Sequence, residues 1–331
     1  MLVFALLGCR DPSGVPTTCR AEGVRLTRQF LQHHHGRYVQ ARKRALAYLD
    51  RLTVDPVALR QQGIKGKKKL VELLDAYVAA SRRADAKERQ QLLQRFQRAA
   101  AVTAPPAYHD MATVEDKQFR QDATSYLRAC YLMEKMGLNA RAYRTEIQKI
   151  RLRLDAHLGQ RGSHQRMAFS WYYRHFGFPL PPALRDPLSA SIVAHRLNPY
   201  RLTISQGYDL THEVFVPFDY GGKLQTEQFS AADRAYLRRA LEIQATVQIA
   251  RRNVDLLGEL LMCLRLLGDT DLAVYRDGLA FVLSSQRPSG AFGNYERLRA
   301  KRGDLLEVEL YLHTTSVAMD ILPLAFDGPA S

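Results

Sequence analysis

Apolar residues recur every three or four positions from about residue 23 onward, which is the spacing of amphipathic helices. The pattern is interrupted at Gly, Pro, Asn and Asp, residues that commonly end helices or form turns. Strand signals are almost absent. An array of antiparallel helices with short connections predicts an all-α fold of helical hairpins in one main domain. We predict helices at about residues 23–52, 66–82, 86–101, 114–136, 140–158, 163–176, 186–197, 208–216, 230–250, 253–267, 271–285 and 307–325.

Two of the predicted hairpins resemble each other. The segments that start at Tyr126 and Leu257 align so that Gly137 matches Gly268, and a Tyr-Arg pair opens the second helix of each. Any two helical hairpins with glycine caps share some of these features. A true repeat would favour a ring or a solenoid.

A turn and a late helix support closure into a ring. The turn SSQRPSGAFGNYE (residues 284–296) resembles the Q-x-x-x-G-x-F/W turn of the α/α toroids of terpene cyclases and protein prenyltransferase β-subunits. Downstream, LYLHTTSVAMDIL resembles the toroid helix that carries a zinc-ligand histidine in prenyltransferases, with matches at His313 and Thr314. The resemblance implies an α/α toroid of five or six hairpins. It implies neither activity, because the Asp-x-Cys of the zinc site and the Asp-rich cyclase motif are missing.

A wider resemblance covers DATSYLRACYLMEKMG, RGSHQRMAFSWYY and YDLTHEVFVPFDYG. These segments are similar to a bacterial family of exported helical domains of unknown function. The likeness implies a fold and a compartment, and it implies no chemistry.

The composition excludes several classes of protein. With 46% hydrophobic and 24% charged residues, the chain can bury a core and is not intrinsically disordered. Its four cysteines, Cys9, Cys19, Cys130 and Cys263, have no CxxC spacing, so neither a structural zinc site nor a disulfide framework is predicted. No P-loop, GxSxG elbow or dinucleotide fingerprint occurs.

The net charge of +15 is concentrated in the first third of the chain. Residues 20–110 hold 19 Lys/Arg against 8 Asp/Glu, whereas residues 111–331 hold 28 against 24. A basic face can attract nucleic acid, but no nucleic-acid motif or aromatic platform accompanies this one. We therefore expect a solvated basic surface and no nucleic-acid partner. Its densest cluster is Lys65, Lys67, Lys68 and Lys69.

The first residues, MLVFALLGC followed by RDPSGVPTTC, resemble the end of a bacterial lipoprotein signal, although a positively charged n-region is missing. In this interpretation Cys9 carries the lipid, residues 1–22 are signal and tether, and the protein lies in the bacterial cell envelope. The membrane would be a partner only through this anchor. If the likeness is accidental, the chain is cytoplasmic. The rest divides into a basic helical portion, 23–110, and a core with the candidate site, 111–331.

Two predicted helices carry acids and a histidine among apolar residues. Asp255 and Glu259 are four residues apart, so they lie on one side of a helix rich in leucine. Paired carboxylates can bind a cation or act as acid and base. His313 shares a helix face with Asp320. The plainer interpretations are an amino-terminal acid pair favoured by the helix dipole and a satisfied core histidine.

The segment YDLTHEVFVPFDYGG adds further candidates. We expect Asp209 to cap a short helix that ends at Pro217 and delivers His212 and Asp219 to the mouth of the ring. Tyr208 and Tyr220 are candidates for substrate binding, as are Asp255 and Trp171. The predicted catalytic residues are His212, Asp219, Glu259 and His313.

Three function classes remain open. We favour an enzyme of lyase or hydrolase type that acts on a small polar or anionic substrate by His/carboxylate acid–base chemistry. A divalent metal such as zinc is an alternative, with His212, Asp255, Glu259 and His313 as its candidate ligands. The second class is a non-catalytic envelope lipoprotein that binds a ligand, and the third is a basic-faced nucleic-acid or protein scaffold. No oligomeric state follows from the sequence.

Overall fold

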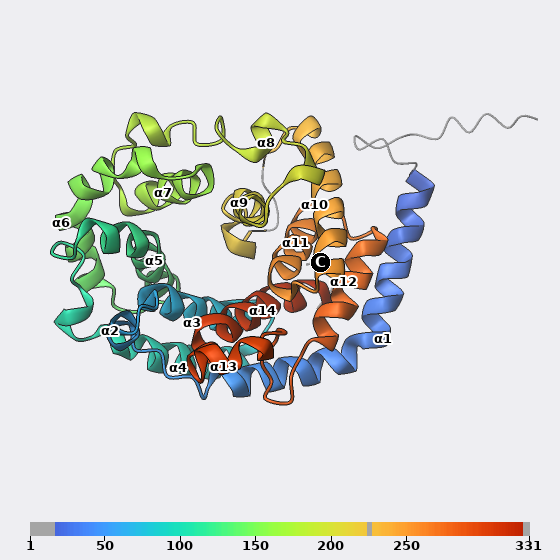
Figure 1. The fold of residues 1–331 in the computed structure, drawn as a ribbon, viewed down its shortest axis with the longest axis horizontal. Helices are drawn as coiled ribbons and strands as arrows, with labels where there is room; N and C mark the ends of the chain where they lie inside the picture. The colour runs from blue at the N-terminus through green and yellow to red at the C-terminus, as the bar shows by residue number, and fades with distance from the viewer. Residues whose placement is uncertain (1–16, 224–226, 327–331) are drawn as a thin grey trace, which may run out of the picture.

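The computed structural model describes residues 17–223 and 227–326 (Figure 1). Within these residues every regular element is helical, and β pairing is limited to one isolated bridge between Gln286 and Phe292. The all-α prediction is therefore confirmed. Cys9 and most of the predicted signal and tether lie outside the described residues.

The α-helices follow the predicted order, with two additions, α2 and α13. They are α1 (Thr17–Leu49), α2 (Pro56–Gln61), α3 (Gly66–Ser81), α4 (Ala86–Ala100), α5 (Asp116–Lys135), α6 (Arg141–Ala156), α7 (Ser163–Phe176), α8 (Ile192–His195), α9 (Ile204–Phe215), α10 (Ala231–Arg251), α11 (Val254–Leu267), α12 (Ala273–Ser284), α13 (Arg299–Arg302) and α14 (Leu312–Phe326). A π-helical segment, Glu307–Tyr311, leads directly into α14.

Two predicted helices differ from the structure. The helix predicted over 186–197 is reduced to the four residues of α8. Helix α9 begins four residues earlier than predicted, because Thr203 and Gln206 form a capping box that satisfies its first turn. Asp209 is therefore not a cap. It lies inside α9, where its Oδ1 is 3.1 Å from Nδ1 of His164.

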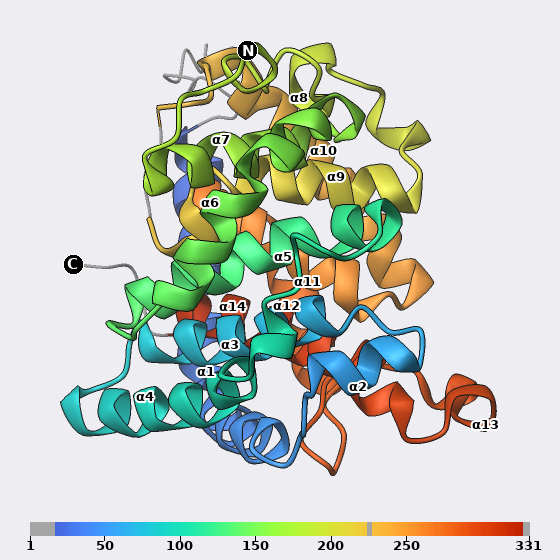
Figure 2. The ribbon, with the colours of Figure 1, turned by 90° about the vertical axis from the view of Figure 1, so that its left-hand side faces the viewer.

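Six helices, here called the inner helices, contact one another in cyclic order: α3, α5, α7, α9, α11, α14 and again α3. Figure 1 shows them around the centre of the molecule, and the side view in Figure 2 shows α3, α5 and α7 stacked one above the other. Helices α1, α4, α6, α10 and α12 pack outside them: α4 contacts α3, α6 contacts α5, α10 and α12 contact α11, and α1 contacts α12 and α14. The two hairpins that resemble each other, α5–α6 and α11–α12, each supply one inner and one outer helix.

Helices α11 and α14 begin side by side. Asp255 and His313 are the second residues of α11 and α14, and their side chains are 3.4 Å apart. His164, the second residue of α7, contacts Asp209 in the middle of α9. Because each peptide dipole points along its helix, the adjoining amino termini of α11 and α14 bring their partial positive charges together.

Close packing between α11 and α14 fixes the floor of the ring. A Cβ on Gly258 would lie 2.6 Å from Cγ1 of Val317, so only glycine allows this approach. Around it, Leu256, Leu257 and Leu260 are fully buried. Full burial of a leucine side chain contributes about 1.5–3 kcal/mol, so these contacts hold the starts of the two helices in register.

The turn that resembles the toroid turn, residues 284–296, ties α1 and the residues that follow it to the segment after α12. Gln286 donates a hydrogen bond of 2.7 Å to the carbonyl of Ala41, and Arg51 donates one of 2.7 Å to the carbonyl of Ser289. Gly290 has a φ of 97°, and a Cβ there would lie 2.2 Å from the carbonyl oxygen of Arg44. The turn therefore requires glycine at this position.

Candidate functional site

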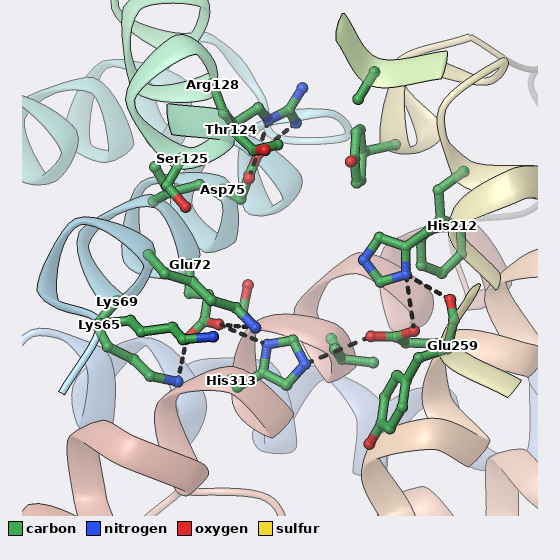
Figure 3. A pocket seen from close by; sticks show the side chains of 18 of the residues that line it. Lys65, Lys69, Glu72, Asp75, Thr124, Ser125, Arg128, His212, Glu259 and His313 are labelled. Carbon is green, nitrogen blue, oxygen red and sulfur yellow. Dashed lines mark hydrogen bonds and ion pairs between the residues drawn. The ribbon is translucent and has the colours of Figure 1, made fainter. Parts of the chain in front are cut away.

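A cavity of about 780 Å³ lies among the six inner helices (Figure 3). Five of these helices line it mainly with their amino-terminal halves, whereas α9 lines it with its middle and carboxyl-terminal part, between residues 208 and 215. Most of the lining residues are polar: they include three histidines, His164, His212 and His313, together with carboxylates, cationic side chains and tyrosines. The cavity takes side chains from both predicted portions of the chain, because α3 belongs to the basic portion.

His313 lies on the floor of this cavity, between the carboxylates of two other helices. Its Nδ1 is 3.1 Å from Oε1 of Glu72 on α3, and its Nε2 is 3.4 Å from Asp255 and 3.5 Å from Glu259, both on α11. Burial opposes a charge on His313, but Asp255, Glu72 and Glu259 raise its pKa to about 10. In the metal-free protein at neutral pH, His313 is therefore a cation.

Two lysines compensate the negative charge on the far side of Glu72. Lys69, which is buried, donates a hydrogen bond of 2.8 Å to Glu72, and Nζ of Lys68 is 3.5 Å from it. Burial alone would raise the pKa of Glu72, but Lys69 and His313 hold it well below its usual range. Glu72 is thus an ionised bridge between lysines and an imidazolium.

The two carboxylates of α11 are held by hydroxyl donors. Thr211 donates a hydrogen bond of 2.5 Å to Oε2 of Glu259. Asp255 accepts hydrogen bonds from Tyr208, 2.6 Å, and Thr314, 2.9 Å. Both acids are at least nine-tenths buried, so these donors replace water that the carboxylates lose on folding.

His212 has a defined tautomer. Its Nδ1 is 2.8 Å from the backbone carbonyl of Tyr208, and a carbonyl can only accept, so Nδ1 carries the proton. Burial lowers the pKa of His212, and Glu259, whose Oε2 is 3.8 Å away, offsets this only in part. The neutral ring therefore has a lone pair on Nε2. In Figure 3 this second nitrogen points towards the open centre of the pocket.

A group of cationic side chains, here called the basic wall, faces His212 across the cavity. It consists of Lys65 and Lys68 at the start of α3 and of Lys117 and Arg120 at the start of α5. Among the described residues, Lys65 and Lys117 form no salt bridge. Arg120 donates a hydrogen bond of 3.1 Å to the neutral amide of Gln160. The wall thus presents cationic charge that the protein itself leaves largely uncompensated.

Six of the eight predicted site residues line the cavity: Tyr208, His212, Tyr220, Asp255, Glu259 and His313. Three helices, α9, α11 and α14, place His212, Asp255, Glu259 and His313 around the same cavity, as expected.

Asp219 and Trp171 do not line the cavity, which corrects their expected placement. Asp219 lies beyond the carboxyl end of α9 and, unlike its neighbour Tyr220, is not a lining residue. Its carboxylate accepts hydrogen bonds from Tyr131 and Lys135, at 2.8 and 2.7 Å, and pairs with Arg128. These cations hold the pKa of Asp219 below its usual value against the effect of burial. Trp171 stacks on His175 and packs edge-on against Tyr131.

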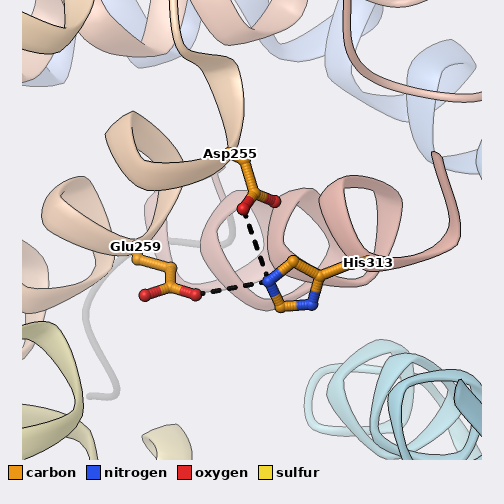
Figure 4. A group of neighbouring side chains, drawn as sticks. All are labelled: Asp255, Glu259 and His313. Carbon is orange, nitrogen blue, oxygen red and sulfur yellow. Dashed lines mark ion pairs between the residues drawn. The ribbon is translucent and has the colours of Figure 1, made fainter. Parts of the chain in front are cut away.

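Three side chains in the cavity have an arrangement that can hold a metal ion. One ligand atom from each of Asp255, Glu259 and His313 lies within 4.8 Å of the others (Figure 4). The set supplies one nitrogen and two oxygens, a mixture typical of divalent-metal sites.

The comparison with protein families covers most of the chain. The model described as "Domain of unknown function (DUF6895)" matches residues 38–319. The chain belongs to the DUF6895 family. The match includes all six inner helices up to the middle of α14, and thus nearly the whole lining of the cavity. No match was found among curated proteins or among solved structures.

Sequence reasoning missed several residues of the cavity. Lys69, expected on a solvated surface, is buried and lines the cavity. Lys67, expected on the same surface, is buried outside the cavity, where it donates hydrogen bonds to the carbonyl of Tyr108 and to Asp110. Glu72 was not a candidate at all. An available signal was its position within the apolar run LVELL, three residues after Lys69, since a charge in such a run needs a partner.

The described part of the DUF6895 chain has no helix that is both long and apolar enough to cross a membrane.

Asp320 gives the site a pH-dependent stability. Asp320 lines the cavity, and burial raises its pKa to about 7. Arg82, 3.1 Å away, and more weakly Arg128 lower this pKa, whereas the negative charge of Asp75 raises it further. The pKa of Asp320 is higher in the folded protein than in the unfolded chain, where it is about 3.9, so the protonated carboxyl favours the folded state. This contribution to the free energy of unfolding is complete below pH 4 and is lost as pH rises through 7.

We therefore expect Asp320→Asn, which cannot ionise, to gain stability relative to the wild type between pH 4 and 7, by about 1 kcal/mol or more. Urea unfolding across this range measures the difference. The exposed Asp304→Asn serves as the control, for which no such divergence is expected. A constant difference between Asp320→Asn and the wild type from pH 4 to 7 would contradict the assignment.

Proposed function

We propose that this DUF6895 protein is an enzyme that uses His212 as a general base on a small anionic substrate, in a reaction of lyase or hydrolase type. The observation that carries the proposal is the Nε2 lone pair of His212, which points into the cavity and has no partner among the described residues. The side chain of His212 is 31% exposed, so this nitrogen is accessible to a ligand.

Glu259 completes the base. When His212 takes a proton from a substrate or from water, its ring becomes positive. The ionised Glu259, 3.8 Å from Nδ1, stabilises that charge, while the carbonyl of Tyr208 keeps the ring oriented. A base that is oriented in this way contributes about 10²–10⁴-fold to a reaction rate.

The charge of the substrate follows from the opposite wall and from the helix termini. Within the part of the chain that the structure describes, Lys65, Lys117 and Arg120 have no carboxylate partner, and the amino ends of α3 and α5 add partial positive charge beside them. An acidic group of the substrate bound there would place the rest of the molecule toward His212. A carboxylate or a phosphate ester satisfies this requirement.

We also propose that the six inner helices and their outer partners form an α/α toroid. The cyclic contacts of the inner helices and the packing of α1 against both α12 and α14 support this arrangement. In such a ring the cavity has one mouth at the amino-terminal side, where the basic wall lies.

His212→Gln tests the proposed activity, because glutamine keeps a donor near the Tyr208 carbonyl but has no basic nitrogen. A panel of small hydroxy-carboxylates and phosphate monoesters is incubated with each protein, and substrates and products are quantified by mass spectrometry. We expect turnover by the wild type and a loss of about 10²–10⁴-fold in His212→Gln. The matched control is His195→Gln, an exposed histidine outside the cavity.

Equal turnover by the wild type and His212→Gln would reject the base. Saturable binding by the wild type without turnover of any panel member would favour a non-catalytic binding protein instead.

The basic wall is tested by removing its unpaired charges. We expect Lys65→Gln and Lys117→Gln each to weaken the binding of citrate or inorganic phosphate, measured by calorimetry, by about 5- to 10-fold, and to reduce its salt dependence. Lys87→Gln, at an exposed lysine of α4 outside the cavity, should bind as the wild type does. Unchanged affinity in both wall variants would show that the anion binds elsewhere.

A further inference from the structure

We infer that Asp255, Glu259 and His313 form a binding site for one divalent transition-metal ion on the floor of the cavity. The site adjoins the base His212, so it deepens the proposed function, but the geometry that supports it does not require any particular reaction.

The separations of the three side chains match a coordination shell. Metal–ligand bonds of about 2.1 Å at tetrahedral angles place ligand atoms roughly 3.4 Å apart. Nε2 of His313 is 3.4 Å from Oδ2 of Asp255 and 3.5 Å from Oε1 of Glu259. An ion could therefore be held without moving the two helices, α11 and α14, with small adjustments of the side chains (Figure 4).

The second atom of each side chain already has a partner, which is the usual support of a metal ligand. Nδ1 of His313 faces Oε1 of Glu72 at 3.1 Å, a carboxylate behind a histidine. That contact directs Nε2 toward the two acids of α11.

The acids are oriented in the same way. Thr211 holds Oε2 of Glu259 and leaves Oε1 toward the histidine, while Thr314 holds Oδ1 of Asp255 and leaves Oδ2 on that side. Oδ2 also accepts from Tyr208, but a carboxylate oxygen has two lone pairs, so one remains for an ion. A simple ion pair would not need three separately positioned donors.

The burial of the ligands suits a site that binds substrate or water in addition to the protein. Asp255 and Glu259 are 7% and 2% exposed, whereas the side chain of His313 is 24% exposed and lines the cavity. Three protein ligands leave at least one position open toward the cavity. One nitrogen and two carboxylate oxygens favour ions such as Zn²⁺, Mn²⁺ or Fe²⁺, since soft thiolate ligands are absent from the set.

The local charges permit the exchange of a proton for an ion. When the metal binds, Nε2 of His313 releases its proton to solvent and donates its lone pair to the ion. Lys68 and Lys69 continue to neutralise Glu72, so the two acids of α11 face the ion. The bound ion would then add positive charge to the floor of the cavity, which matches an anionic ligand.

The test is a titration of chelator-treated full-length protein with Co²⁺, followed by visible absorption, and with Zn²⁺, followed by calorimetry. Because His33, His34 and His35 form a run on α1 that can bind metal adventitiously, all proteins carry His33→Gln, His34→Gln and His35→Gln. We expect one ion per chain. Glu259→Gln and His313→Gln should weaken binding by at least 100-fold, and Glu72→Gln, behind the histidine, by about 10- to 100-fold.

Glu309→Gln is the matched control, because Glu309 lines the same cavity but is not in the ligand set. It should bind the ion as the parent does, and circular dichroism checks that every variant is folded. The absence of stoichiometric binding by the folded parent would overturn the site. Equal affinity in Glu259→Gln, Glu72→Gln and Glu309→Gln would overturn it as well.

The two proposals fail separately. His212→Gln should lose turnover yet keep the metal, since its ring is outside the ligand set. His212-dependent turnover by a folded parent that binds no ion in the titration would reject the metal site alone, whereas stoichiometric metal binding without any His212-dependent turnover would reject the base alone.

Discussion

A partly buried imidazolium joins three helices of this protein, and the rest of the site depends on it. His313 of α14 lies between Glu72 of α3 and the acids Asp255 and Glu259 of α11. Loss of one partner would leave an uncompensated buried charge, which typically costs about 3–5 kcal/mol. The charge balance therefore constrains where α3, α11 and α14 begin, and those three helix starts form the floor of the cavity.

The starts of several inner helices contribute to the distribution of charge above this floor. Asp255 lies in the first turn of α11, so its carboxylate is stabilised by the helix dipole as well as by the hydroxyl donors Tyr208 and Thr314. The cations of α3 and α5 remain available at the opposite wall, because the acids nearest to them, such as Glu72 and Asp75, are already paired with Lys69 and Arg128. A neutral base and a free basic wall can coexist in one cavity for this reason.

Part of this arrangement could be predicted from the sequence, because it depends on local spacing. The helical periodicity predicted most elements, and the i, i+4 spacing of Asp255 and Glu259 predicted that they share a side. Glu72 and Lys69 were missed because their importance arises from contacts with α14, more than 200 residues away in the chain. Asp219 was misplaced because the sequence does not reveal that Tyr131, Lys135 and Arg128 of α5 bind its carboxylate.

Nitrogen NMR of ¹⁵N-histidine-labelled, metal-free protein at neutral pH tests the central claim most directly, because it reports the protonation of each ring nitrogen. Spectra of His212→Gln and His313→Gln assign the two signals. The account predicts a neutral His212 with its proton on Nδ1 and a His313 with protons on both nitrogens. A proton on Nε2 of His212, or a neutral His313, would contradict it.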